Sequence, residues 1–171
     1  YVFSISSDSL FIEKVYNEAM LYGRANYILV DDFDEETARK FLERYKFSEE
    51  EINKAFYYFG GKPIYLTMAI IEKRYGKNIL ELANEILERR KGQIREIVFS
   101  LEDKNKEQFE KIIKIFDEFK NEEFAKYKYV TEEIRLLADY NIIFVDPSRQ
   151  IIKPQSRIDL LAMREILKEV K

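Results

Sequence analysis

Two side-chain types on which many enzymes rely as nucleophiles, metal ligands or proton carriers are absent from this sequence. Its 171 residues contain no His and no Cys, which excludes thiol nucleophiles, disulfides, Cys/His zinc sites and triads that use an imidazole base. Chemistry is left to carboxylates, Lys, Arg, hydroxyls and backbone groups. No acidic pair stands out from the helix-face pattern, so a stand-alone enzyme that uses two carboxylates is not favoured.

The first candidate site is the turn Gly60-Gly61-Lys62-Pro63. Its glycines allow close approach of the backbone, and its proline adds a rigid ring. From the residues alone, a helix C-cap followed by a proline at the first position of the next helix explains the pattern best. The turn is not a Walker phosphate-binding loop, because it lacks the glycine spacing and the Ser or Thr after the lysine. Lys62 therefore gains no phosphate role from the sequence.

Other conspicuous runs have simple explanations. The aromatic run 56–59 points in several directions around a helix, so at most a pair of its rings could share a site. The acidic runs 31–32 and 49–51 suit turn chemistry and the first turn of a helix. We predict no dedicated metal site within this chain.

Composition predicts a globular, mostly helical protein. The sequence is 46% hydrophobic and 36% charged, with only 5 Gly and 3 Pro, which favours long regular elements with few turns. No apolar run approaches the roughly 18 residues of a membrane span, and the start lacks the charged region of a signal peptide. We expect a cytoplasmic protein without a membrane partner. A net charge of -3 does not suggest nucleic-acid binding.

The first 33 residues read as a short strand at 1–5, a helix at 8–21 and a second short strand at 27–30. Two short strands cannot form a sheet with a covered core, and the first residue is Tyr rather than Met. We therefore expect that the chain is cut at its front.

Residues 34–101 have the periodicity of a helical bundle. Asp34 is the predicted N-cap of one helix, and Ser48 with Glu51 forms the capping box of the next. The helix that begins at Pro63 is apolar around more than one face, so we expect it to be buried. A fourth helix runs from Ile79 past Gly92 and ends near residue 101.

Residues 102–171 follow a polar connector with a different order of elements. A helix at 109–119 and a short helix at 124–129 precede a third helix capped by Thr131. Two strands at 142–145 and 150–153 follow, and a closing helix ends the chain. Three helices followed by a hairpin are the order of a winged helix.

In this order, the strand with Ser6-Ser7, the Gly23-Arg24 pair, the bundle with its Gly-Gly-Lys-Pro turn and the winged helix resemble the archaeal ATPase family within the AAA+ and STAND groups of P-loop NTPases. The resemblance covers nearly the whole chain. It implies a mainly α fold with short β elements, divided into the residual edge of an α/β P-loop core at 1–33, a helical-bundle lid at 34–101 and a winged helix-turn-helix domain at 102–171. The family's phosphate-binding loop and most of its sheet are then expected before Tyr1.

By this resemblance Ser6 and Ser7 occupy the sensor segment that follows a core strand, and Arg24 lies near the nucleotide phosphates. A permanently charged guanidinium suits that role. Two simpler readings stay open, in which Ser7 caps the following helix and Arg24 is a surface or structural residue.

The resemblance also implies that Gly60, Gly61 and Pro63 lie on the adenine side of a bound nucleotide. The intact protein would bind ATP or ADP with Mg and hydrolyse ATP, whereas this chain alone, which lacks a Walker loop, would hold no nucleotide and be inactive. Its expected partners are the P-loop core and, through the winged helix, a protein or duplex DNA.

A DNA-binding regulator is the alternative function, with Arg135, Arg149, Lys153 and Arg157 as the candidate phosphate contacts. Acidic and basic side chains are equal in number over residues 121–171, whereas phosphate binding needs a clustered excess of cations. A regulatory or packing role for the winged helix is therefore favoured. A helical interaction module without any ligand is the third interpretation.

Overall fold

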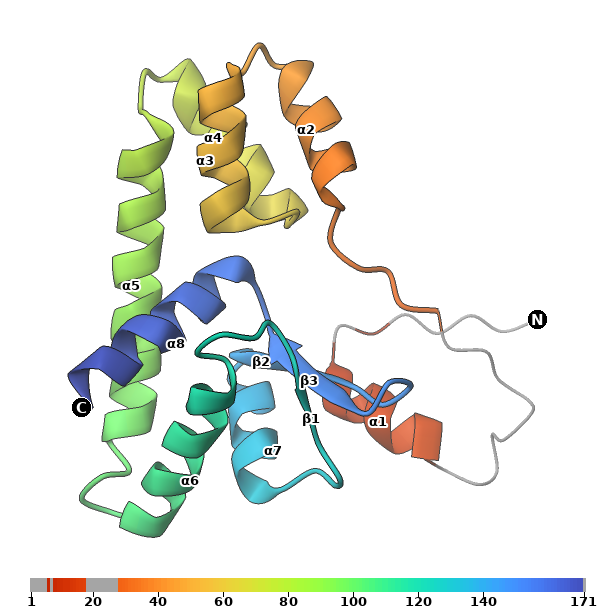
Figure 1. The fold of residues 1–171 in the computed structure, drawn as a ribbon, viewed down its shortest axis with the longest axis vertical. Helices are drawn as coiled ribbons and strands as arrows, with labels where there is room; N and C mark the ends of the chain where they lie inside the picture. The colour runs from red at the N-terminus through yellow and green to blue at the C-terminus, as the bar shows by residue number, and fades with distance from the viewer. Residues whose placement is uncertain (1–5, 7, 18–27, 171) are drawn as a thin grey trace.

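The computed structural model describes residues 6, 8–17 and 28–170, apart from the side chain of Tyr16. These residues form a helical bundle, drawn at the top of Figure 1, and a second part built around a small sheet below it. The bundle consists of α2 (Glu35–Glu43), α3 (Glu49–Phe59), α4 (Pro63–Arg74) and the first half of α5 (Ile79–Phe99). The long helix α5 continues into the second part, so both parts share one helix (Figure 1).

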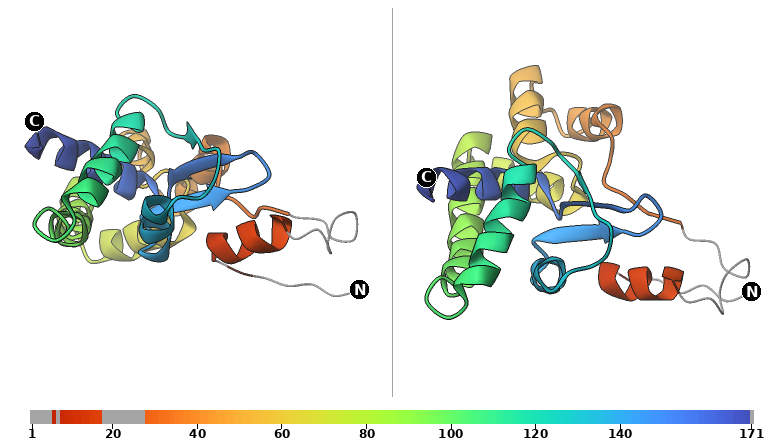
Figure 2. Two further views of the ribbon diagram at one scale, coloured as in Figure 1. Left: turned by 90° about the horizontal axis from the view of Figure 1, so that it is seen from below. Right: turned by 60° about the horizontal axis from the view of Figure 1, so that its bottom comes forward.

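The second part packs helices against a three-stranded antiparallel sheet of order β1-β3-β2. Its elements are α6 (Lys106–Glu118), β1 (Ala125–Lys126), α7 (Glu132–Asp139), β2 (Ile143–Asp146), β3 (Ile151–Pro154) and α8 (Arg157–Glu169). The short helix α1 (Ser9–Asn17) packs against β2 and α7, as both views in Figure 2 show. The described residues are thus mainly helical with a small sheet.

Local capping determines where most helices begin. The side chains of Asp34, Ser48 and Thr131 accept hydrogen bonds from the backbone N–H three residues later, at 2.8, 3.3 and 3.3 Å. Glu51 completes the capping box of α3 by accepting from the Ser48 N–H at 2.7 Å. Each such bond satisfies a donor that the helix itself cannot satisfy. The predicted starts of these helices are confirmed.

Replacing Ser48 by alanine is expected to lower the free energy of unfolding by about 1 kcal/mol, because the α3 N-terminus then loses its side-chain acceptor. Urea denaturation of the two proteins measures the difference. Lys54→Ala is the control, since Lys54 makes only an exposed ion pair with Glu50 in the same helix and its loss is worth at most about 0.5 kcal/mol. Equal losses in the two variants would contradict the capping argument.

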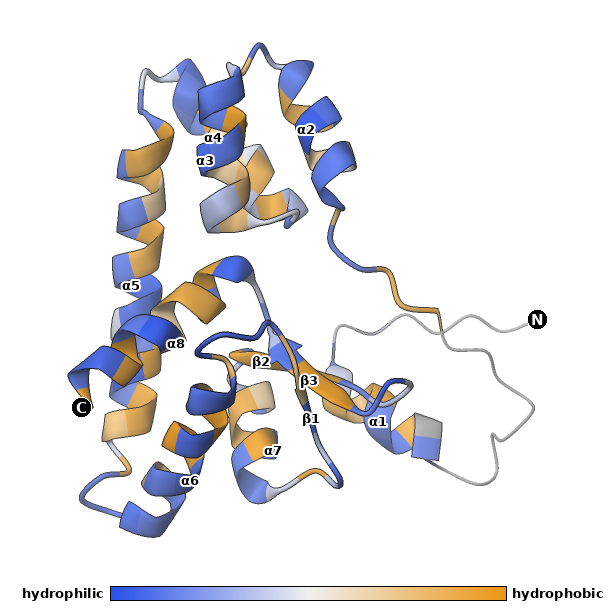
Figure 3. Cartoon of the chain, viewed as in Figure 1, coloured by the Kyte–Doolittle hydropathy of each residue, from blue (hydrophilic) through white to orange (hydrophobic). Residues whose placement is uncertain are grey.

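A continuous hydrophobic core runs through both parts of the molecule. Phe59 and Leu66 fill it in the bundle, Ile94 continues it along α5, and Phe116 and Met163 fill it in the second part. Figure 3 shows the apolar sides of α5, α6 and α8 turned toward one another. The helix α5 therefore joins two packed regions without an exposed linker between them.

The predicted short helix at 124–129 is wrong. Ala125 and Lys126 instead form β1, paired with Ile152 and Ile151 of β3. Pairing with a strand 25 residues away outweighs the local helical spacing, as tertiary context often does for short segments. The described region after residue 102 therefore has one helix fewer before its hairpin than the sequence predicts, and one strand more.

The predicted strand at 27–30 is also not formed, because residues 28–30 are irregular. Ile28 and Val30 are 79% and 91% exposed, and none of the described strands pairs with them. The predicted strand at 1–5 lies outside the described residues. Of the helix predicted at 8–21, the part from Ser9 to Asn17 is observed as α1, and the rest is likewise outside.

The prediction that the helix beginning at Pro63 is buried is wrong for one of its faces. Leu66, Ala69 and Ile70 of α4 are buried, but Ile64 and Ile71 are 62% and 45% exposed. In the bundle α4 contacts α2, α3 and α5, which cover only part of its circumference. Some apolar side chains of α4 therefore stay exposed to solvent in the described structure.

Candidate functional site

The candidate site is the turn between α3 and α4. Gly60 ends α3 with φ +58, a conformation that suits glycine, and its N–H donates to the Phe56 carbonyl at 2.9 Å. Lys62 is the N-cap of α4 and Pro63 its first residue, where the missing N–H of proline costs nothing. The sequence pattern therefore has a complete local explanation, as expected.

Gly61 has a second role, which is tertiary. Its carbonyl accepts a hydrogen bond from the Phe33 N–H at 3.0 Å. A Cβ at position 61 would lie 1.7 Å from the Phe33 carbonyl oxygen, far inside van der Waals contact. The ring of Phe33 also packs edge-on against Phe41 of α2, with centroids 5.8 Å apart. The turn therefore holds the segment that leads into the bundle.

The outer side of the turn is apolar. Pro63 is exposed, and the next residue, Ile64, is 62% exposed. These two adjacent residues thus expose a rigid ring and an aliphatic side chain at the start of α4. Such a surface can bind and orient a ligand but carries no group for acid–base chemistry.

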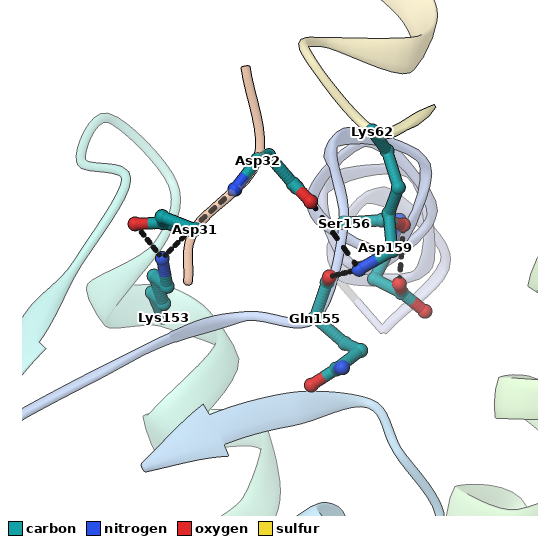
Figure 4. Close-up of polar contacts among 7 residues, drawn as sticks. All are labelled: Asp31, Asp32, Lys62, Lys153, Gln155, Ser156 and Asp159. Atoms are coloured by element: carbon teal, nitrogen blue, oxygen red, sulfur yellow. Dashed lines mark hydrogen bonds and ion pairs between the residues drawn. The ribbon is translucent and has the colours of Figure 1, made fainter. Parts of the chain in front are cut away.

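The Lys62 side chain makes contacts within the chain. Its Nζ donates to the Gln155 carbonyl at 2.7 Å, at the junction of β3 and α8, and lies 3.9 Å from Asp32 Oδ1 (Figure 4). Its ammonium group is thus engaged with two groups within the chain. The structure therefore gives Lys62 a role in holding the turn against β3 and residue 32.

Two adjacent aspartates before α2 face different partners. Both oxygens of Asp31 accept from Lys153 Nζ at 2.7 Å, whereas Asp32 faces Lys62 (Figure 4). Burial opposes ionisation of Asp31, but hydrogen bonds from Lys153 and from the Asp32 N–H, with the charges of Lys153 and Arg149, hold its pKa below the usual value. For Asp32, burial and the neighbouring Asp31 charge raise the pKa despite Lys62. The segment is therefore tied to cations on both parts of the molecule.

A buried ion pair joins α5 to α8. Arg90 Nε donates to Asp159 Oδ1 at 2.6 Å, and Arg90 Nη2 donates to the Asn141 carbonyl at 2.7 Å. Ser156 donates to the other oxygen of Asp159 at 2.5 Å (Figure 4). Burial raises the pKa of Asp159, although Arg90 and Ser156 oppose that shift. Sequence analysis missed this pair. The Ser-x-x-Asp capping spacing could have indicated Ser156 and Asp159, but nothing local indicates Arg90.

Two known families match successive parts of the chain, and the first match contains this turn. Residues 1–69 match the family described as an ATPase domain predominantly from Archaea, and residues 80–167 match the family described as "Uncharacterized ATP-binding protein MJ1010-like, C-terminal domain". The chain belongs to the MJ1010-like family of archaeal ATPases. No solved structure matches it significantly.

Relatives in the MJ1010-like family match along the whole chain. It is 50% identical over 171 residues to "Uncharacterized ATP-binding protein MJ1659" of Methanocaldococcus jannaschii, covering 100% of the chain and 47% of that protein. It is 44% identical over 168 residues to "Uncharacterized ATP-binding protein PYRAB06260" of Pyrococcus abyssi, covering 98% of the chain and 47% of the relative. The chain spans about half the length of the curated relatives it matches.

The sensor residues that the family resemblance implies are largely outside the described residues. Ser7 and Arg24 lie there, so their roles stay predictions. Ser6 is exposed, and its Oγ accepts from the Asp8 N–H at 3.1 Å. Asp8 in turn caps α1, accepting from the Leu10 and Phe11 N–H groups at 2.9 and 3.0 Å. The start of α1 therefore has a capping side chain without Ser7.

The candidate DNA contacts do not form one free basic surface. Lys153 is paired with Asp31, and Arg157 pairs with Glu123 while donating to the Tyr57 carbonyl at 3.2 Å. Arg135 and Arg149 are exposed, with Arg149 3.9 Å from Asp146. Three of the four candidates thus have an acidic partner within the molecule.

Two kinds of feature are absent from the described residues. None of the helices seen in the structure has the length and apolar character to cross a membrane. Within the same residues, no three acidic side chains come together as metal ligands would.

Proposed function

We propose that the chain is the C-terminal half of an ATP-driven switch, in which the bundle α2–α4 acts as a lid over a nucleotide. The observation that carries this proposal is the place of the turn. The ATPase-domain match runs to residue 69 and so ends within α4, just past Gly60-Gly61-Lys62-Pro63. The curated relatives are named ATP-binding proteins, which supports the same ligand here.

In this proposal the adenine stacks on Pro63 and Ile64, whereas Gly61 is buried and lets the backbone of Phe33, rather than the nucleotide, come close. The exposed apolar side of the turn fits a planar base. The phosphates and magnesium are held mainly by groups outside this chain. Arg24 neutralises phosphate charge, and Ser6 and Ser7 report the presence of the γ-phosphate. The chain by itself supplies recognition and closure rather than hydrolysis.

The second part then acts as the output of the switch. Its elements, with the hairpin β2–β3 between α7 and α8, fit a reduced winged helix that serves regulation or protein contact. Three ion pairs link α5 to α8: Arg90 with Asp159, Lys91 with Glu165 at 3.1 Å and Arg95 with Glu169 at 3.4 Å. We therefore expect the lid and the second part to move as one body when the nucleotide is hydrolysed.

Replacing Pro63 by alanine in the full-length protein is expected to weaken ATP binding about tenfold, which corresponds to about 1.4 kcal/mol of lost stacking. Alanine is tolerated at the first position of a helix, so the fold should persist. Fluorescence titration with a labelled ATP analogue measures the dissociation constant. Pro147→Ala, in the turn between β2 and β3, is the matched control and should leave it unchanged. Equal affinities for wild type and Pro63→Ala would refute the adenine contact.

Duplex DNA binding is the alternative output and has less support. Lys153 and Arg157 are held by Asp31 and Glu123, and Glu132 and Glu133 lie in the first turn of α7, where a recognition helix would approach phosphate. Salt-dependent binding to duplex DNA that is lost on replacing Arg135 and Arg149 would favour this alternative.

A further inference from the structure

Residues 31–33 touch both parts of the molecule through three successive residues. Asp31 binds Lys153 in β3, Asp32 faces Lys62 in the α3–α4 turn, and the Phe33 N–H donates to the Gly61 carbonyl. Figure 4 shows the two aspartates turned toward the two lysines from a single extended stretch. The short segment thus lies between the sheet and the bundle.

Lys62 provides a second link between the bundle and the end of β3. While it faces Asp32, its Nζ also donates to the Gln155 carbonyl at 2.7 Å. Asp32 is therefore connected through Lys62 to the residue that follows β3, the strand that carries Lys153. Contacts of the segment with the sheet and with the bundle are parts of one network.

The strength of these contacts differs from that of the α5–α8 pair. The side chains of Asp31 and Asp32 are 49% and 40% exposed, so each pair contributes at most about 1 kcal/mol and weakens with salt. Asp159 is only 4% exposed, and a buried pair of that kind is far more costly to break. The weak contacts are the ones that can open while α5 and α8 stay together.

Two side chains just before this segment are largely exposed. Ile28 and Val30 are 79% and 91% exposed, so they contribute little apolar burial that would fix the path of the chain. Among the described contacts, those of residues 31–33 position the segment.

We propose that Asp31, Asp32 and Phe33 form a charge-dependent clasp that fastens the segment entering the bundle to both the α3–α4 turn and the C-terminal sheet. When the clasp opens, the segment at 31–33 can move relative to the bundle and the second part, which the buried α5–α8 pair keeps together. The clasp requires no nucleotide, so it stands or fails independently of the ATP-binding proposal.

The test is residue-resolved hydrogen exchange of the Phe33 amide in the full-length protein, comparing wild type with Lys153→Glu. Lys153 contacts Asp31, whereas the Phe33 amide bonds to the bundle. A clasp couples the two, so exchange at Phe33 should become roughly three- to fivefold faster in the variant, as expected for loss of one exposed pair. Asp31→Lys combined with Lys153→Asp should restore the slow exchange.

Lys54→Glu is the matched control, because it makes the same charge change at an exposed pair within α3 and should leave the Phe33 amide unaffected. Raising the salt concentration should speed exchange at Phe33 more in wild type than in Lys153→Glu, because the variant keeps only the Asp32–Lys62 pair. If Lys153→Glu also loosens the amides of α5 and α8, Asp31→Asn replaces it as the milder variant. Unchanged exchange at Phe33 in Lys153→Glu, or in Asp31→Asn where that is used, would overturn the clasp.

Discussion

Replacing Arg90 by alanine is expected to lower the free energy of unfolding by about 3 kcal/mol, the largest effect that we predict for a single substitution. The change leaves the Asp159 carboxylate, which is 4% exposed, without its cation, and an unpaired buried charge is strongly destabilising. The guanidinium also loses its bond to the Asn141 carbonyl. Urea or thermal denaturation at neutral pH measures the difference.

The loss should depend on pH in a defined direction. Burial raises the folded-state pKa of Asp159 above its unfolded value, so the stability associated with the neutral carboxyl is fully present below the unfolded pKa and is lost as pH rises through the folded pKa. Without Arg90 that shift becomes larger. The deficit of Arg90→Ala should therefore be greatest at neutral pH and shrink toward about pH 4.

Two comparisons separate the buried charge from a general loss of packing. Arg39→Ala removes another arginine, paired with the exposed Glu49, and should cost at most about 1 kcal/mol. Arg90→Met combined with Asp159→Leu removes both charges and should be more stable than Arg90→Met alone. A double variant as unstable as the single one would show that the unpaired carboxylate is not the cause.

Replacing Gly61 by alanine is expected to lower the free energy of unfolding by about 2 kcal/mol, the usual cost of forcing an extra carbon into a packed contact. The new Cβ would lie 1.7 Å from the Phe33 carbonyl oxygen, so the segment before α2 must move away from the turn. Its hydrogen bond to the Gly61 carbonyl is then weakened or lost. Denaturation measures the loss, and faster exchange of the Phe33 amide should accompany it.

Gly92→Ala is the matched control for this substitution. Gly92 lies inside α5, and a Cβ there would meet nothing within 4 Å. Alanine should therefore raise the stability by about 0.5–1 kcal/mol through its better helix propensity. If the free energy of unfolding falls in Gly61→Ala and rises in Gly92→Ala, the contact with Phe33 is the cause. An unchanged free energy of unfolding in Gly61→Ala would refute this explanation.

The Arg90–Asp159 pair and the Gly61–Phe33 contact connect different parts of the molecule and differ in their exposure to solvent. The Arg90–Asp159 pair lies between α5 and α8 and is shielded from solvent, while the Gly61–Phe33 contact lies where an exposed segment meets the bundle. In the proposed switch, the Arg90–Asp159 pair keeps the lid and the output part together. The Gly61–Phe33 contact is the place where the segment before α2 can begin to move.

The sequence by itself determined most of the helices and the site's local geometry. Asp34, Ser48 and Thr131 mark helix starts because their side chains bond to amides three residues away, and such contacts are encoded within one turn of the chain. The turn at Gly60 and Pro63 was predictable for the same reason. The order of these elements also sufficed to indicate the archaeal ATPase family.

Only the tertiary structure decided how distant residues are used. Ala125 became part of a strand because β3 is there to pair with it, and Lys153, a candidate DNA contact, is instead bound to Asp31, 122 residues away. The partner of Asp159 and the close approach of Phe33 to Gly61 were equally hidden from the sequence. Capping depends on neighbours in the chain, whereas ion pairs, strand pairing and close backbone contacts depend on which segments packing brings together.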